Sequence, residues 1–237
     1  MNDATTTRRV FLDIGAHVGE TLAVVRRPRW RFAEIHCFEP APSCWPRLHA
    51  LADGRVTVWP VGLSDEDRTA ELFGAGSIGA SLSAEKGGQG DPVVCELRDA
   101  GTWFAEHAPG WAGAEVFAKI NVEGAEPEIV SSLAAAGALA RIDHLLIHFD
   151  VRKVPGRAPL EAQVRQQLTS AGVEYVEASR FIHGDVARGT RNWLVWCGLR
   201  SPATRRAYEV LRAAEGRARV ALYPVKGALG RLARRRA

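Results

Sequence analysis

The chain has 237 residues and a formal net charge of +4, with 46% apolar and 24% charged residues. This composition is typical of a globular protein, and the length suits one large α/β domain with or without an appendage. No apolar run approaches the roughly 20 residues of a membrane span, and the polar segment 1–9 has no signal-peptide core. The sequence therefore predicts a cytoplasmic protein.

The positive charge is concentrated at the carboxyl end. Residues 201–237 hold ten Lys/Arg and two Asp/Glu, whereas residues 1–200 hold 21 basic and 25 acidic residues. We therefore expect a mildly acidic domain over 1–200 and a basic, partly helical tail over 201–237, with a helix over 204–222. The basic cluster 231–236 would dock on an anionic membrane surface, making the protein peripheral there. Nucleic-acid phosphates and plain solvation are the alternatives.

A glycine turn after the first strand organises the chain. Residues 8–14 form a short apolar run that predicts a strand, and Asp13, Gly15 and Gly19 give the pattern D-x-G-x-x-x-G. Gly15 would let the backbone approach a ligand, and Gly19 would let the next helix, over 20–27, pack closely on the strand. The pattern differs from the G-x-G-x-x-G dinucleotide fingerprint. A glycine turn of another α/β protein is the alternative.

A second strand over 34–38 ends at Glu39 and Pro40, and a helix is expected up to residue 51. Glu39 follows the glycine turn by about 20 positions, where nucleotide-binding folds use an acid to accept hydrogen bonds from ribose hydroxyls. A solvated glutamate is the alternative. A third strand over 55–61 is followed by the loop 62–65, which would lie at the same edge and border an adenine ring.

The middle of the chain predicts a short strand over 69–73, a strand over 91–97 and a helix capped by Asp99 that runs through residue 107. The Gly- and Ser-rich segment 74–91 predicts a mobile loop. It is either a lid over a substrate or a plain surface excursion.

A central strand over 115–122 carries polar residues toward its carboxyl end. Lys119, Asn121 and Glu123 alternate onto one face, and a helix opens at Pro127. Polar residues on an interior strand are costly unless they are paired or functional. A structural ion pair between Lys119 and Glu123 is the alternative to a functional site.

The remaining elements complete a sheet. A strand over 142–150 brings His148 and Asp150 to its carboxyl end, and an amphipathic helix over 159–171 follows. Strands over 173–176 and 192–197, joined by a turn, are expected to finish the sheet. The four scattered cysteines fit no zinc template, so they predict reduced thiols (Cys37, Cys44, Cys95 and Cys197).

Four motifs together resemble the FkbM-type S-adenosylmethionine (SAM) methyltransferases over about residues 8–198. They are F-L-D-I-G-A-H-V-G-E (11–20), F-E-P-A-P (38–42), V-G-L-S-D (61–65) and A-K-I-N-V-E-G-A-E (118–126). The first is also similar to motif I of class I SAM methyltransferases. The resemblance implies a doubly wound, Rossmann-like α/β sheet, mostly parallel with an antiparallel last strand. It also implies SAM as cofactor and a hydroxyl of a saccharide or other small molecule as methyl acceptor.

The resemblance assigns roles to residues of this chain. Asp13 would hold the methionine end of SAM, Glu39 the ribose, and the glycines the backbone cradle. The expected cofactor-binding set is Asp13, Gly15, Ala16, His17, Gly19, Glu39, Pro40, Gly62, Leu63 and Asn121. His148 is the first candidate base because an imidazole has an unperturbed pKa of about 6.5, and a histidine bonded within the fold is its alternative. Glu123 is the second candidate, oriented by Lys119.

One departure from the family keeps other functions open. The family commonly has Asp in a K-x-D-x-E-G-x-E motif where this chain has Asn121. An amide is a poorer metal ligand and no base, so we predict no metal site, and a non-catalytic SAM-binding module stays an alternative. A nucleic-acid methyltransferase is a second alternative that the basic tail favours. However, no Asn/Asp-Pro-Pro-Tyr type motif follows the central strand, so we do not expect a nucleic-acid partner.

Overall fold

The computed structural model describes residues 7–77, 79–87, 91–199 and 201–215. The chain separates into two compact units, Met1–Glu177 and Ala178–Ala237. The sequence placed a boundary after residue 200, whereas here the segment 178–200 groups with the carboxyl-terminal part.

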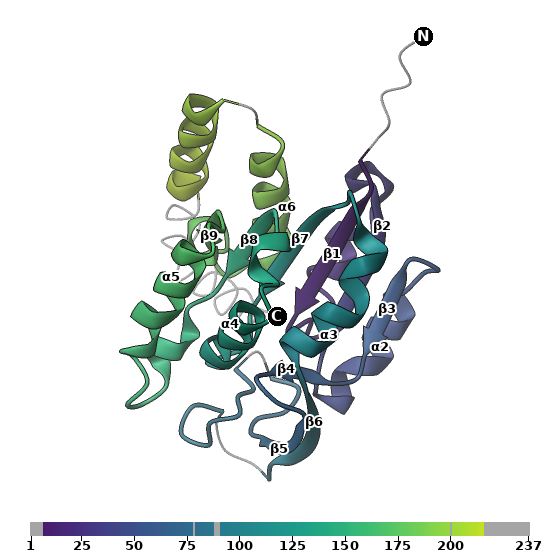
Figure 1. Cartoon of the computed structure of the whole chain (residues 1–237), viewed down its shortest axis with the longest axis vertical. Helices are drawn as coiled ribbons and strands as arrows, with labels where there is room; N and C mark the ends of the chain where they lie inside the picture. Colours follow the sequence, from purple (N-terminus) through teal and green to yellow (C-terminus); the bar gives the residue numbers. More distant parts are fainter. Residues whose placement is uncertain (1–6, 78, 88–90, 200, 216–237) are drawn as a thin grey trace, which may run out of the picture. The chain divides into compact units, whose positions relative to one another are not determined.

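The first unit is built on a six-stranded sheet in the order β3-β2-β1-β7-β8-β9 (Figure 1). Every neighbouring pair of these strands is parallel. The strands are β1 (Arg9–Ile14), β2 (Phe32–Phe38), β3 (Val56–Trp59), β7 (Glu115–Ile120), β8 (His144–Ile147) and β9 (Tyr175–Glu177). The predicted doubly wound, Rossmann-like α/β fold is therefore confirmed. The chain order reverses between β1 and β7, which is the place where such sheets bind ligands.

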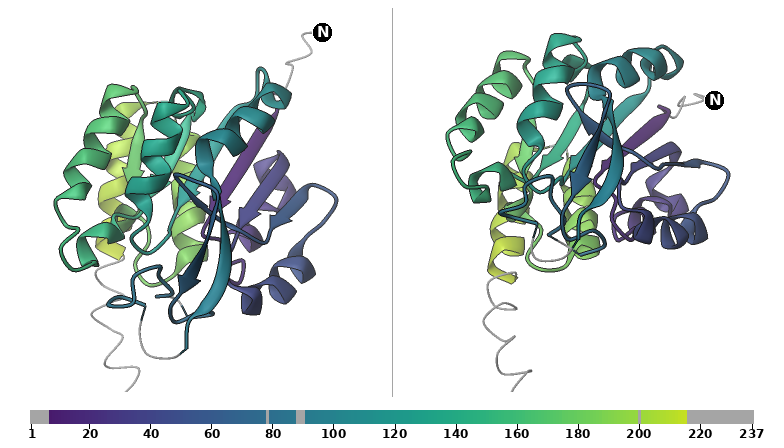
Figure 2. Two further views of the ribbon diagram at one scale, coloured as in Figure 1. Left: turned by 60° about the horizontal axis from the view of Figure 1, so that its bottom comes forward. Right: turned by 90° about the horizontal axis from the view of Figure 1, so that it is seen from below.

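Helices cover both faces of this sheet (Figure 2). They are α1 (Leu22–Val25), α2 (Trp45–Leu51), α3 (Ala100–His107), α4 (Glu126–Ala135) and α5 (Leu160–Ser170). Short 3-10 turns accompany them: η1 (Pro28–Trp30), η2 (Pro42–Cys44), η3 (Ala108–Trp111), η4 (Leu139–Arg141) and η5 (Asp150–Lys153). Alternate β1 residues pack with buried side chains of α3, α4 and α5 in one core cluster (Val10, Leu12, Ile14, Trp103, Ile129, Val130, Val164, Leu168). Period-two alternation thus assigns one face of β1 to these helices.

A second, mixed sheet of three strands lies toward the carboxyl ends of the main sheet (Figures 1 and 2). It consists of β4 (Gly62–Ser64), β6 (Val93–Asp99) and β5 (Arg68–Leu72), with β4 parallel and β5 antiparallel to β6. The predicted strands over 69–73 and 91–97 are confirmed. The segment 62–65 was predicted to be a loop, but Gly62–Ser64 form the strand β4. The strand was missed because three residues are too few to show a period-two pattern.

The prediction of a last strand over 192–197 is wrong. Residues 192–197 belong to a helix, α6 (Val186–Cys197), so the main sheet has no antiparallel last strand among the described residues. Asp185 caps this helix by accepting a hydrogen bond from the Arg188 amide at 2.9 Å. Its buried residues follow helical spacing (Gly189, Thr190, Trp193, Leu194 and Trp196).

Other parts of the second unit are η6 (Ala178–Arg180) and a helix over 202–215. The expected tail helix over 204–222 is thus present as far as residue 215, and its remainder and the basic cluster 231–236 lie outside the described residues. None of the helices in the described part of the chain has the length and apolar character that crossing a bilayer requires.

Candidate functional site

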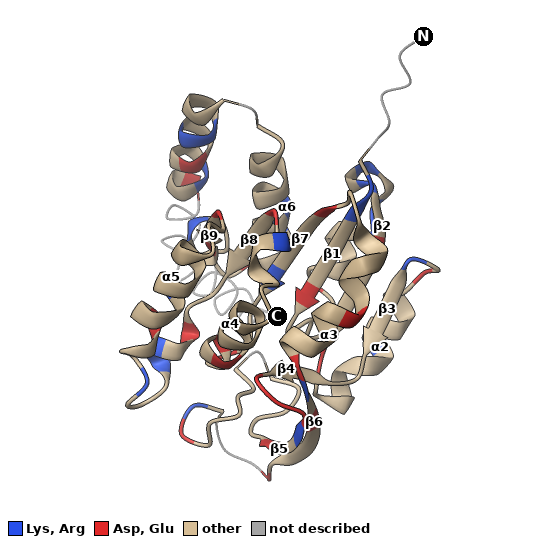
Figure 3. Cartoon of the chain, viewed as in Figure 1, with Lys and Arg blue, Asp and Glu red and all other residues tan. Residues whose placement is uncertain are grey.

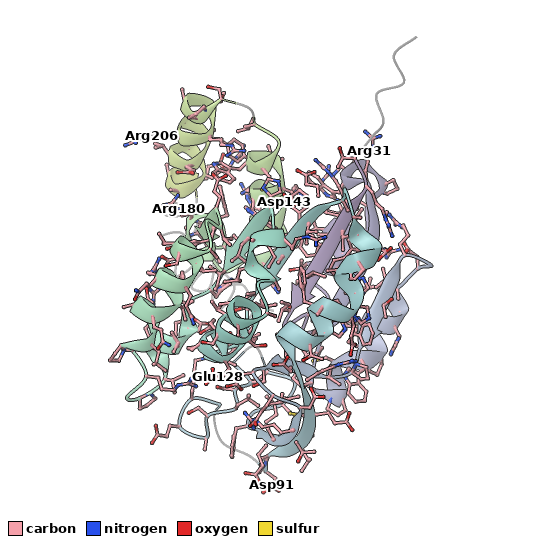
Figure 4. All side chains as sticks on the ribbon, viewed as in Figure 1. Arg31, Asp91, Glu128, Asp143, Arg180 and Arg206 are labelled. Carbon is pink, nitrogen blue, oxygen red and sulfur yellow. The ribbon has the colours of Figure 1, made fainter. Side chains whose placement is uncertain are left out.

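The carboxyl ends of β1, β2, β7 and β8 carry most of the residues singled out in the sequence. Figure 3 shows acidic and basic positions at this lower edge of the sheet. In Figure 4, Glu128 of α4 lies near this edge, whereas Asp143, just before β8, lies toward the amino ends of the strands.

The glycine turn after β1 is tied to both neighbouring strands. The amides of Gly15 and Ala16 donate to the Phe38 carbonyl of β2, at 3.1 and 2.9 Å. Gly15 has φ +80°, and a Cβ there would overlap the main-chain carbonyl of Asn121, which follows β7. Glycine is therefore required because the turn approaches the end of β7.

Gly19 serves a different contact from the predicted one. Its φ is +89°, and a Cβ would lie 2.8 Å from Leu51 Cδ1 and 3.2 Å from Leu48 Cδ2. Both leucines belong to α2. The missing side chain of Gly19 therefore lets α2 pack against the turn, whereas the sequence predicted that it would let the helix after the turn pack on the first strand.

Glu39 is turned inward onto the glycine turn. The residue is 7% exposed, and its carboxylate accepts the His17 amide at 2.7 Å and the Ala41 amide at 2.9 Å. Burial raises the pKa of this carboxyl, while the two amides act in the opposite direction. The acid at the end of β2 thus holds the turn after β1, and a solvated side chain is excluded.

Asp13 and Lys119 form a buried ion pair between β1 and β7. The Lys119 ammonium donates to Asp13 Oδ1 at 2.7 Å and to the Gly15 carbonyl at 2.9 Å. Burial raises the pKa of Asp13 despite the lysine. Lys119 was expected to orient Glu123, and that prediction is wrong because β7 directs it to β1 instead.

Four polar atoms at this edge are buried and have no hydrogen-bond partner within the described residues. They are Asp13 Oδ2, His17 Nε2, Asn121 Oδ1 and His148 Nε2. Buried polar atoms are nearly always satisfied in proteins, so four at one edge indicate a place where a polar ligand or water completes the site. His17 is further marked by a left-handed φ of +48°, and its Nδ1 lies 3.0 Å from Glu20 Oε1.

His148 follows β8 directly, and its amide donates to the Ile120 carbonyl at 2.9 Å. Burial and then the charge of Lys119 lower the pKa of its imidazole to about 4. The ring is therefore neutral near pH 7, with one nitrogen available to accept a proton.

Glu123, in the turn after β7, contacts residues that were not predicted to belong to the site. Its carboxylate pairs with Lys86, and its main-chain carbonyl accepts the Ser81 hydroxyl at 2.8 Å. Burial and the neighbouring Asp150 raise the pKa of Glu123, whereas Lys86 lowers it. Lys86 and Ser81 belong to the Gly- and Ser-rich segment 74–91. No sequence pattern in that segment predicts a contact of either residue with Glu123.

Glu126 completes the motif from the first turn of α4. It is fully buried, accepting the Gly124 amide at 3.1 Å and the Val151 amide at 2.8 Å. Burial raises the pKa of its carboxyl to about 7. The side chain links the turn after β7 to the segment after β8.

The remaining predicted cofactor residues lie beside this site or in the core. Ala16 is buried in the glycine turn, and a Cβ at Gly62 would lie 3.6 Å from Pro40. Leu63 is buried in the same core cluster as residues of α3 and α4. No group of three or more His, Cys, Asp or Glu side chains in the described ranges is arranged to hold a metal ion.

No protein-family model and no curated protein matches the sequence. Among solved structures, the chain is similar to an FkbM methyltransferase from Methylobacillus flagellatus KT, with a TM-score of 0.34 and 15% sequence identity. The match covers 57% of this chain and 32% of the other protein. This chain therefore spans about a third of that protein's length.

Proposed function

We propose that this chain is a SAM-dependent methyltransferase that transfers a methyl group to a hydroxyl of a saccharide or another small molecule. The single observation that carries the proposal is the position of Glu39. The lone acid at the end of β2 meets the glycine turn after β1, next to the place where the strand order reverses. Together with the four-motif resemblance, this arrangement favours a nucleoside-bearing cofactor.

The residues at this edge fit such a cofactor. Each Glu39 oxygen accepts one amide, so each keeps a lone pair for a ribose hydroxyl. Asn121 Oδ1 and His17 Nε2 are buried atoms without a partner among the described residues, and amino or hydroxyl groups would satisfy them. Asp13 is buried, and its Oδ1 accepts a hydrogen bond from Lys119. It would therefore contact the methionine end of SAM through Oδ2 alone.

SAM supplies an electrophilic methyl group on its sulfonium when bound. The chain must hold the acceptor hydroxyl in line and take its proton. His148 Nε2 is the first candidate for the second task because that nitrogen is unpartnered in the described structure and the ring is neutral, although burial makes it a weaker base than a free imidazole. Glu123 is the second candidate, and Lys119 fixes the carbonyl of Gly15 and so the shape of the glycine turn.

The experiment is a transfer assay with methyl-labelled SAM and a panel of saccharides and small hydroxylated metabolites. We expect label in at least one acceptor class, and a loss of at least about a hundredfold in kcat for His148→Ala, the lower end of the range of general-base catalysis. His49→Ala, at an exposed position of α2, is the matched control and should transfer like the parent. Binding of SAM with no transfer to any acceptor would favour the non-catalytic module instead.

A further inference from the structure

Glu123 is held at two atoms by one distant segment, residues 79–87, which we call the strap. The Ser81 hydroxyl donates to its main-chain carbonyl at 2.8 Å, and the Lys86 ammonium pairs with its carboxylate. The Lys86 and Glu123 side chains are only 9% and 16% exposed. Because the pair is largely shielded from water, solvent screens its Coulomb attraction less than that of a surface ion pair.

Glu123 needs such support because its backbone is strained. Its φ of +53° lies in the left-handed region, and Gly124 follows at +113°. This conformation is unfavourable for a non-glycine residue, and it persists only where the surrounding structure holds it in place. A hydrogen bond to the carbonyl and an ion pair to the side chain fix the residue on both sides of its Cα atom.

The strap is itself anchored, so Ser81 and Lys86 arrive in fixed places. Ser81 forms a bridge with Phe73 through two main-chain hydrogen bonds of 2.9 and 3.0 Å. The Ser83 carbonyl accepts the Lys86 and Gly87 amides at 3.2 and 2.8 Å, and the Ser83 amide donates to Ser81 Oγ at 3.2 Å. The contact with Glu123 therefore comes from an ordered turn rather than from one long side chain alone.

The charged groups around Glu123 oppose each other. Lys86 and Lys153 favour its ionised form, whereas Asp150 disfavours it. Lys153 lies 2.5 Å from Asp150, so its charge is directed mainly to that carboxylate. Lys86 is thus the principal positive partner of Glu123 among the described residues.

We propose that the strap positions Glu123 for the proposed methyl transfer, with Ser81 fixing its main chain and Lys86 keeping its carboxylate charged and oriented. Ser81 and Lys86 are positioning residues that act through Glu123. The inference rests on the proposed function for the catalytic part, whereas the hold on Glu123 is independent of any cofactor.

The effect of Lys86 on Glu123 is tested by NMR titration of the Glu123 carboxyl carbon in the full chain. Lys86→Met should raise the pH of its titration midpoint by about one unit, because an opposite charge at this distance lowers a carboxyl pKa by about that much or more. Lys86→Arg should restore the parent midpoint. Glu85→Gln is the control, since Glu85 is an exposed residue of the strap. An unchanged midpoint in Lys86→Met would overturn the proposal.

The catalytic part is tested by steady-state kinetics on the same variants. Lys86→Met and Ser81→Ala should each lower kcat several-fold and shift its pH profile, with SAM affinity unchanged. Lys86→Arg should recover most of the rate, and Glu85→Gln should match the parent. A parent-like kcat and pH profile in Lys86→Met would refute the positioning role. If the parent transfers no methyl group, the proposed function fails, while the titration still decides whether the strap holds Glu123.

Discussion

At the scale of single residues, the site is defined by side chains that bind the backbone of neighbouring turns. Glu39 holds the amide of His17, Lys119 holds the carbonyl of Gly15, and Glu126 holds the amides of Gly124 and Val151. These contacts join the ends of separate strands, so the hydrogen bonds of these buried side chains depend on backbone groups that the fold must place correctly. The polar residues at these strand ends were predicted from the sequence. Lys119 was predicted to pair with Glu123 and pairs with Asp13 instead, because the alternation of a strand indicates which face a side chain lies on but not its partner.

Gly15→Ala should destabilise the chain because the added Cβ would overlap the Asn121 carbonyl in a left-handed conformation. We expect a loss of at least about 2 kcal/mol in the free energy of unfolding. Gly54→Ala is the matched control: no atom lies within 4 Å of its added Cβ, and it should change stability by less than about 0.5 kcal/mol. Urea unfolding of both variants measures the difference, and equal midpoints would be inconsistent with the close approach.

Glu126 predicts a pH dependence of stability. Burial raises its carboxyl pKa from 4.5 to about 7 in the folded state. The folded chain then keeps a proton that the unfolded chain releases, so this contribution is full below about pH 4.5 and is lost as the pH rises through 7. Its size is at most about 3 kcal/mol.

Glu126→Gln removes the titrating carboxyl, so the difference in unfolding free energy between the variant and the parent measures its contribution. Relative to the parent, the variant should gain stability between about pH 5 and about pH 8, in urea unfolding series at the two pH values. A stability difference between variant and parent that stays constant across this range would contradict the assignment to Glu126.

At the scale of elements, helix caps and buried positions explain which helices and strands were predicted correctly. Asp99 begins α3 as predicted, and its carboxylate accepts the Thr102 amide at 2.6 Å and the Ser132 hydroxyl of α4 at 2.7 Å. Residues 192–197 were predicted as a strand because their apolar run is short. Periodicity alone cannot separate such a strand from a buried helix face. The helical signal was the cap at Asp185 and the spacing of Trp193 and Trp196.

Asp99→Ala should therefore uncap α3 and leave Ser132 with one partner fewer. We expect a loss of about 1–2 kcal/mol in unfolding free energy, within the range of removed N-caps. Asp91→Ala, at an exposed position before β6, serves as the control and should be nearly neutral. Thermal or urea unfolding tests the pair, and the expectation fails if both variants unfold at the parent midpoint.

At the scale of the whole molecule, the doubly wound α/β sheet was predictable from the sequence, and the assembly of the site was only partly so. Apolar runs ending in glycine or acid marked β1, β2 and β7, and the rule that parallel strands share one carboxyl edge brought Asp13, Glu39 and Lys119 together. The second sheet and the strap contacts could not be predicted, because Ser81 and Lys86 reach Glu123 across 42 and 37 positions of sequence. Such long-range contacts depend on tertiary packing and leave no local pattern.

The whole account depends on whether this edge binds SAM through Glu39. The most direct measurement is calorimetric titration of SAM into the full chain, its Glu39→Gln and Glu39→Ala variants, and Glu71→Gln at an exposed position of β5 as control. We predict that the parent and Glu71→Gln bind one SAM per chain and that both Glu39 variants bind at least about tenfold more weakly, a loss of about 1.4 kcal/mol or more. Binding by Glu39→Ala as tight as that of the parent, or no binding by a folded parent, would contradict the account.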